Sequence, residues 1–126
     1  MTGHILVVED DPLWLGVVER RLTKAGYTVE SARNGRVALQ WLADTPALPA
    51  LVLTDLLMPE ADGLDLCAGV RGNSHTAHLP IIIMSAIDGV DLRARAAAFG
   101  VFRYLTKPVP AVELLLTVDA AMASTS

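Results

Sequence analysis

The sequence predicts an α/β fold in which helices cover both faces of a parallel β-sheet. Short runs rich in β-branched residues alternate with longer segments of helical spacing, which is typical of strands linked by helical crossovers. The central short runs are hydrophobic along their length rather than alternating, as strands buried on both faces are. With 126 residues, the chain is expected to form a single domain over residues 1–126, with a core at about 4–122 and a short flexible C-terminal tail.

The first strand is predicted at residues 4–8 (HILVV), and a helix is predicted at 12–25. Asp11 is a typical N-cap, Pro12 suits the first helical position, and Gly26 ends the helix. One helical face is formed by Leu15, Val18, Leu22 and Ala25. This face is expected to pack on the sheet.

The second strand is predicted at 27–32 (YTVESA), followed by an ordinary turn at Arg33–Gly35 and a helix at 35–43. The third strand is predicted at 51–54 (LVLT) and a helix at 63–71, in which Cys67 is interpreted as a small core residue.

Between the third strand and its helix, Met58-Pro59 is expected to turn the chain away. Asp62-Gly63 carries turn and helix-start chemistry rather than a ligand.

The fourth strand is predicted at 81–85 (IIIMS), with a helix at 89–99 that Gly100 ends. The fifth strand is predicted at 101–106 (VFRYLT), with a helix at 110–122 that has a proline near its start. Five βα units in this order favour a doubly wound sheet, because crossovers between parallel strands are right-handed.

The composition of the chain argues against several classes of function. Lys+Arg is 10 against Asp+Glu 14, a net charge of −4, which argues against a nucleic-acid-binding surface. A single cysteine fits a reducing compartment. The start of the chain has no signal-peptide pattern, and the apolar runs are too short to span a membrane. A soluble cytoplasmic domain without membrane contact is therefore expected.

Acidic and basic groups follow the strands at one edge of the predicted sheet. The residues at these strand ends are Glu9, Asp10, Asp55, Ser85 and Lys107. Ligands of open α/β sheets lie outside the carboxyl ends of the strands. Clustered carboxylates repel one another unless a cation binds or a pKa rises, and oxygen ligands in a site open to water favour Mg²⁺.

Such a set of groups suits phosphoryl transfer. A metal ion and Lys107 would neutralise the oxygens of the phosphoryl group, and the Ser85 hydroxyl would hold one of them. Asp55 is the candidate nucleophile, since it stands alone at the end of the middle strand.

Four motifs together resemble the receiver domain of two-component response regulators. They are ILVVEDDP, LTDLLMPEADG, IIIMSA and YLTKP, and the likeness extends over residues 4 to about 122. It implies a flavodoxin-like (βα)5 doubly wound sandwich whose five-stranded parallel sheet has the order 2-1-3-4-5. It also implies that the chain catalyses only its own phosphoryl transfer and dephosphorylation.

The resemblance assigns a role to each site residue. Asp55 would be the phosphoacceptor for a phosphohistidine on a sensor histidine kinase or a histidine phosphotransfer protein. Mg²⁺ would be bound by Asp10, Asp55 and the backbone carbonyl of Leu57, with Glu9 acting directly or through water. Lys107 and Ser85 would hold the phosphoryl group, Ser85 and Tyr104 would form the switch, and the Lys107–Pro108 bond is often cis in this family.

The implied output surface is formed by the helix predicted at 89–99, the strand predicted at 101–106 and the helix predicted at 110–122. Phe102 and Tyr104 are expected on the same side of the fifth strand, as a surface for a downstream partner or for self-association. Local packing of Phe102 under the fourth helix is the alternative. Thr117 and Asp119 stand where winged-helix regulators usually carry arginines, so no DNA-binding output is expected.

Two positions beside the site depart from the family pattern. Leu57 and Ile87 are apolar where many receivers have polar residues, and apolar cover should hinder a hydrolytic water. We therefore expect a phosphoryl lifetime longer than that of the Leu57→Asn variant.

Some polar residues have simpler interpretations. Asp11 is better interpreted as a helix cap than as a metal ligand. His75 and His78 belong to a solvated loop, and Arg93 and Arg95 to the solvent-facing side of their helix.

Three other functions remain open. A haloacid-dehalogenase-like phosphatase usually has a second acid two residues after its nucleophile, where Leu57 stands here. A nucleotide or flavin binder would need a glycine-rich loop after the first strand, where EDDPLWLG stands. A receiver-like docking module that works without phosphorylation would not need the complete set of acids, serine and lysine.

Overall fold

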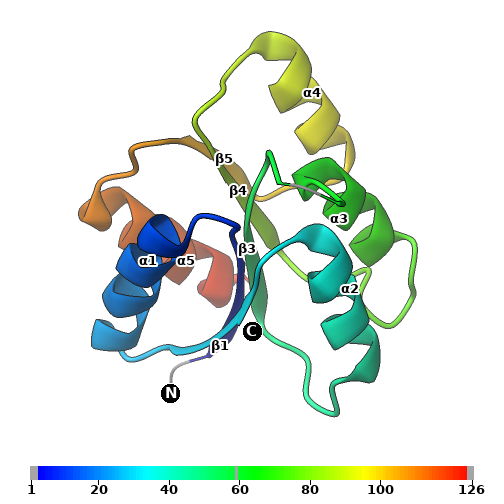
Figure 1. The fold of residues 1–126 in the computed structure, drawn as a ribbon, viewed down its shortest axis with the longest axis horizontal. Coiled ribbons are helices and arrows are strands. Elements are labelled where there is room, and N and C mark those ends of the chain that lie inside the picture. The colour runs from blue at the N-terminus through cyan, green and yellow to red at the C-terminus, as the bar shows by residue number, and fades with distance from the viewer. Residues whose placement is uncertain (1–2, 59, 125–126) are drawn as a thin grey trace.

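The computed structural model describes residues 3–58 and 60–124, and shows a five-stranded parallel sheet between two layers of helices (Figure 1). The strands are β1 (His4–Val8), β2 (Thr28–Ala32), β3 (Leu51–Asp55), β4 (Ile81–Ser85) and β5 (Arg103–Thr106). The helices are α1 (Pro12–Lys24), α2 (Gly35–Asp44), α3 (Gly63–Arg71), α4 (Val90–Ala98) and α5 (Ala111–Ala123). In the described ranges, none of the helices combines the length and the apolar character needed to span a bilayer.

The strand order is β2-β1-β3-β4-β5, and every neighbouring pair is parallel. This confirms the expected flavodoxin-like fold. The register aligns the carboxyl ends of the strands, because Val8 pairs with Thr54 and Asp55 pairs with Met84. Residues that leave the ends of β1, β3, β4 and β5 therefore meet at one edge of the sheet.

Each central strand contributes to two separate cores, because successive side chains point to opposite faces. On one face, Leu6, Val52 and Ile83 belong to a cluster that includes residues of α2, α3 and α4. On the other, Val7 and Leu53 belong to a cluster with residues of α1 and α5. Figure 1 shows these two groups of helices on opposite sides of the sheet. Burial on both faces explains why β3 and β4 carry consecutive apolar residues until their polar carboxyl ends.

Side-chain caps begin three of the helices. Asp11 accepts a hydrogen bond from the Leu13 amide at 3.0 Å, which confirms its predicted capping role. Asn34 accepts one from the amide of Val37 at 2.9 Å. Asp62 and Asp65 form a reciprocal capping box at the start of α3. These caps fix where the loops at the carboxyl edge of the sheet turn into helices.

One expectation about β5 is wrong. The strand begins at Arg103, so the alternation of side chains does not extend back to Phe102. Phe102 packs against the α1 and α5 cluster, whereas Tyr104 packs against the cluster on the opposite face. The two rings therefore do not form an aromatic pair on one side of the strand. The predicted turn at Pro59 and the end of the tail at residues 125–126 lie outside the described residues.

Candidate functional site

Three carboxylates gather where β1 and β3 end. Glu9 and Asp10 follow β1, and Asp55 is the last residue of β3. Each offers a carboxylate oxygen, and these oxygens lie within 4.8 Å of one another. Glu9 and Asp55 are buried while Asp10 is exposed, so the cluster opens to solvent on one side. A set made only of oxygen ligands, with one side open to water, fits a hard cation such as Mg²⁺.

Lys107 approaches this cluster from the end of β5. Its Nζ lies 2.8 Å from Glu9 Oε1 and 3.3 Å from Asp55 Oδ2. The Lys107–Pro108 peptide bond is cis, and the Lys107 amide donates to the Ser85 carbonyl at 2.8 Å. Burial lowers the pKa of Lys107, but Glu9 and Asp55 outweigh that effect and raise the pKa above its usual value. The ammonium group is therefore a permanent positive charge facing both acids.

The carboxylate of Glu9 is strongly perturbed by its surroundings. Its side chain is fully enclosed, and this burial raises the pKa of Glu9 to about 7, against the lowering effect of the hydrogen bond from Lys107. The charge of Asp55 contributes to the rise. A bound cation would oppose both effects, because it favours the charged form of each acid. The acids are thus arranged so that a cation relieves their repulsion.

The backbone around Asp55 fixes the direction of its carboxylate. The Leu56 amide donates to Asp55 Oδ1 at 2.7 Å, and the chain returns so that the Gly63 amide donates to the Leu56 carbonyl at 2.7 Å. A Cβ atom at Gly63 would lie 2.5 Å from the Asp55 carbonyl oxygen. The close approach of α3 to the end of β3 therefore requires glycine at this position.

Ser85 lies at the end of β4 and is buried. Its Oγ accepts a hydrogen bond from the Ile87 amide at 3.0 Å. Ile87 is 42% exposed, and Leu57 is 54% exposed, so both apolar side chains reach the surface near the strand ends. The role expected for the Leu57 carbonyl stays a prediction.

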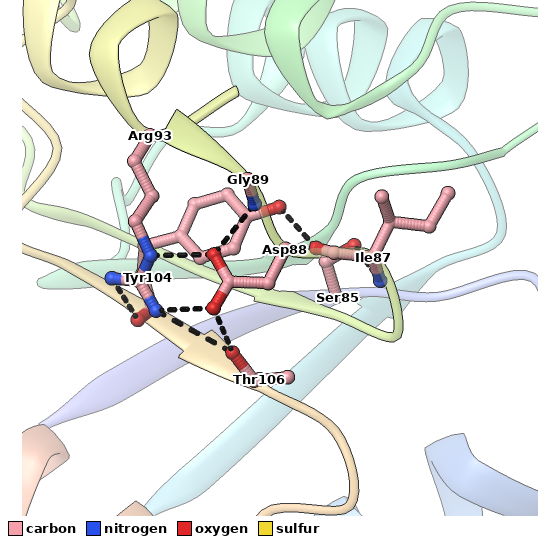
Figure 2. Close-up of polar contacts among 7 residues, drawn as sticks. All are labelled: Ser85, Ile87, Asp88, Gly89, Arg93, Tyr104 and Thr106. Carbon is pink, nitrogen blue, oxygen red and sulfur yellow. Dashed lines mark hydrogen bonds and ion pairs between the residues drawn. The ribbon is translucent and has the colours of Figure 1, made fainter. Parts of the chain in front are cut away.

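Arg93 is exposed, as expected for the solvent-facing side of its helix, and it also makes a set of contacts that the sequence did not predict. Figure 2 shows the Arg93 guanidinium meeting the carboxylate of Asp88, with distances of 2.5 Å from Nε to Oδ1 and 3.1 Å from Nη2 to Oδ2. Thr106 Oγ1 donates to Asp88 Oδ2 at 3.2 Å. The guanidinium also lies 4.9 Å from the centre of the Tyr104 ring, whose hydroxyl donates to the Ile87 carbonyl at 2.6 Å. These contacts tie the loop after β4 to β5.

Sequence reasoning missed this cluster and a second feature beside the acids. A hollow of about 430 Å³ adjoins Glu9 and Asp10 and is also lined by Arg33 and Asn34. The sequence pattern at these two residues predicts only an ordinary turn. Their place at the end of β2, next to β1, was the available signal, because loops at the carboxyl edge of a parallel sheet surround the ligand site.

Comparisons with known families agree with this geometry. The family model described as "Response regulator receiver domain" matches residues 5–119. Response regulator MprA of Mycobacterium tuberculosis is 40% identical over 126 residues, a match that covers 99% of this chain and 53% of that protein. Response regulator PleD of Caulobacter vibrioides is 34% identical over 118 residues, covering 94% of this chain and 26% of that protein. The chain thus spans between a quarter and about half of these relatives.

Solved structures show the same architecture. The signal receiver domain of a signal transduction histidine kinase from Syntrophus aciditrophicus superposes with a TM-score of 0.89 at 32% identity, covering 98% of this chain and 92% of that one. Chemotaxis response regulator CheY4 of Vibrio cholerae superposes with a TM-score of 0.87 at 27% identity, covering 96% and 99%.

Proposed function

The chain belongs to the response regulator receiver domain family, and on that premise we propose that it is a phosphorylation switch in which Asp55 is the phosphoacceptor. The proposal rests on one observation. The carboxylates of Glu9, Asp10 and Asp55 lie close together at one edge of the sheet, and the Lys107 ammonium contacts this cluster. We propose that residues 1–126 act as one such domain in the cytoplasm, where a sensor histidine kinase or a histidine phosphotransfer protein supplies the phosphoryl group.

Each residue of the site has a separate role in the transfer of the phosphoryl group to Asp55. An Asp55 oxygen attacks phosphorus, a new P–O bond forms, and the P–N bond to the donor histidine breaks. The displaced imidazole leaves with a proton taken from water or from the partner. Lys107 offsets the negative charge that accumulates on the phosphoryl oxygens, and the Ser85 hydroxyl turns from the Ile87 amide to donate to one of them.

Mg²⁺ fits the cluster of acids, and when bound it would supply charge neutralisation for the phosphoryl oxygens. Asp10 and Asp55 would hold it with the Leu57 carbonyl, and Glu9 would contribute directly or through water. Hydrolysis of the acyl phosphate by water restores the Asp55 carboxylate, so the chain turns over only its own phosphoryl group.

The switch would act through the loop after β4. When Ser85 turns toward a phosphoryl group, the loop that holds Ile87 and Asp88 shifts with it, and Tyr104 and Arg93 follow because both contact this loop. We propose that the α4-β5-α5 face, which includes Phe102 and Tyr104, then changes its affinity for a downstream protein or for a second copy. The net charge of −4 disfavours direct binding to nucleic acid or to an anionic membrane.

Intact mass after incubation with phosphoramidate and Mg²⁺ tests the proposal. We expect a gain of one phosphoryl group that is lost in Asp55→Asn and in EDTA. Asp62→Asn is the matched control, because Asp62 is a nearby acid that caps α3 and asparagine is also a good cap. The absence of a mass gain in folded protein with Mg²⁺ bound would instead favour a docking module that works without phosphorylation.

A further inference from the structure

The indole of Trp14 lies against the lysine of the candidate site. Lys107 Nζ is 5.6 Å from the centre of the Trp14 ring, within the range of a cation–π contact. Trp14 belongs to the first turn of α1 and packs at the edge of the α1 and α5 cluster. Lys107 therefore contacts two carboxylates and one aromatic face, and its side chain is only 18% exposed.

Arg21 supports the same indole from further along α1. Its guanidinium carbon lies 5.5 Å from the centre of the Trp14 ring, and its Nη1 donates to the Val109 carbonyl at 2.9 Å. Residues seven apart fall on the same side of a helix, so α1 presents Trp14 and Arg21 together. Trp14 contacts Lys107, and Arg21 contacts Val109, which lies two residues later in the chain. The helix thus holds the segment from Lys107 to Val109 at two points.

Packing alone does not account for tryptophan at this position. Its Nε1 is buried and makes no hydrogen bond with the described residues. A buried N–H without a partner lowers stability, and a phenylalanine would place an aromatic ring there without that cost. The property that tryptophan adds here is its electron-rich face, which binds a cation more strongly than phenylalanine does.

We propose that Trp14 is a positioning residue for Lys107. The indole face holds the ammonium between Glu9 and Asp55 and keeps water from one side of it. A lysine has a flexible four-carbon stem, so without this contact the ammonium would sample other positions. Its attraction for a phosphoryl group in the site would then weaken, because charges interact more weakly where water can enter. The kinetic part of this proposal rests on the proposed function, whereas the contact itself does not.

The contact is tested by NMR on the unphosphorylated protein. Protons above an aromatic face resonate upfield, so we expect the ε-methylene signal of Lys107 to be shifted upfield. The shift should be lost in Trp14→Leu and partly kept in Trp14→Phe. The control is Trp41→Phe, which alters the second tryptophan of the chain, on α2 against the other core. An ε-methylene signal that does not change in Trp14→Leu would overturn the proposal.

The positioning role is tested by the rate of phosphorylation with phosphoramidate at saturating Mg²⁺. We expect Trp14→Leu to be slower by about threefold to tenfold, as loss of a partly desolvated cation–π contact would cause, and Trp14→Phe to recover most of the rate. Trp41→Phe should match the wild type. Trp14→Met replaces Trp14→Leu if the latter does not fold.

A wild-type rate in Trp14→Leu, with the NMR shift lost, would show a contact without a positioning role and would overturn the proposal. If the wild type accepts no phosphoryl group, the proposed function fails. In that case the NMR shift still decides whether Trp14 fixes the ammonium.

Discussion

The hydroxyl of Tyr104 donates a hydrogen bond to the carbonyl oxygen of Ile87 at 2.6 Å, which joins β5 to the loop after β4 (Figure 2). The same loop begins at Ser85, whose Oγ accepts from the Ile87 amide. Ile87 is therefore bonded through its amide to a candidate site residue and through its carbonyl to the aromatic ring of β5. Two hydrogen bonds therefore connect the candidate site to the α4-β5-α5 face.

Arg93 is expected to restrain this loop. Its ion pair with Asp88 and its contact with the Tyr104 ring hold the loop against β5, and the Gly89 amide donates to the same Asp88 carboxylate at 2.8 Å. In Arg93→Ala, amide hydrogen exchange at Gly89 should be several-fold faster. Because the pair is exposed and screened by solvent, the free energy of unfolding should change little.

Arg95→Ala is the control for this variant. Arg95 is an exposed arginine of the same helix and forms no ion pair with the part of the chain that the structure describes. Equal exchange rates at Gly89 in the two variants would show that Arg93 does not restrain the loop.

Leu57 is expected to prolong the phosphorylated state. It is 54% exposed, two residues after Asp55, where its side chain can cover a phosphoryl group from water. In Leu57→Asn, an amide that can hydrogen-bond a water molecule replaces this cover, so the acyl phosphate should decay several-fold faster. The decay is measured by intact mass after removal of the phosphodonor. Val112→Asn, at an exposed apolar position on α5, should decay at the wild-type rate, and equal decay for all three proteins would contradict the expectation.

The burial of Glu9 predicts a dependence of stability on pH when no metal is present. Its pKa is about 7 in the folded chain and near the ordinary 4.5 in the unfolded chain, so the folded state binds more protons between these values. The free energy of unfolding should therefore fall by roughly 1 to 3 kcal/mol as the pH rises from 4.5 to 7. Denaturation in EDTA measures this fall, and Glu9→Gln should reduce it. If the free energy of unfolding of Glu9→Gln depends on pH as that of the wild type does, groups other than Glu9 cause the fall.

The sequence predicted the five βα units because burial on both faces of a parallel strand leaves a continuous apolar run, as in β3 and β4. It also identified Glu9, Asp55 and Lys107, since strand ends in a parallel sheet share one edge. It did not predict that Phe102 and Tyr104 pack on opposite faces, because that depends on where β5 begins. The contact of Arg93 with Asp88 and the ring of Tyr104 depends on how α4 lies against β5, which local patterns do not encode.

Arg71, at the end of α3, is expected to contribute strongly to stability. Its guanidinium donates to the Phe99, Leu79 and Ala77 carbonyls at 2.7, 2.6 and 2.9 Å, and to that of Gly100 at 3.3 Å. Arg71→Ala leaves these carbonyls without their donor, so chemical denaturation should show a loss of about 2 to 4 kcal/mol. Arg71→Lys should recover only part of this lost stability, since one ammonium group cannot replace the several donors of the planar guanidinium. A loss no larger than that of Arg95→Ala would mean that water satisfies the carbonyls equally well.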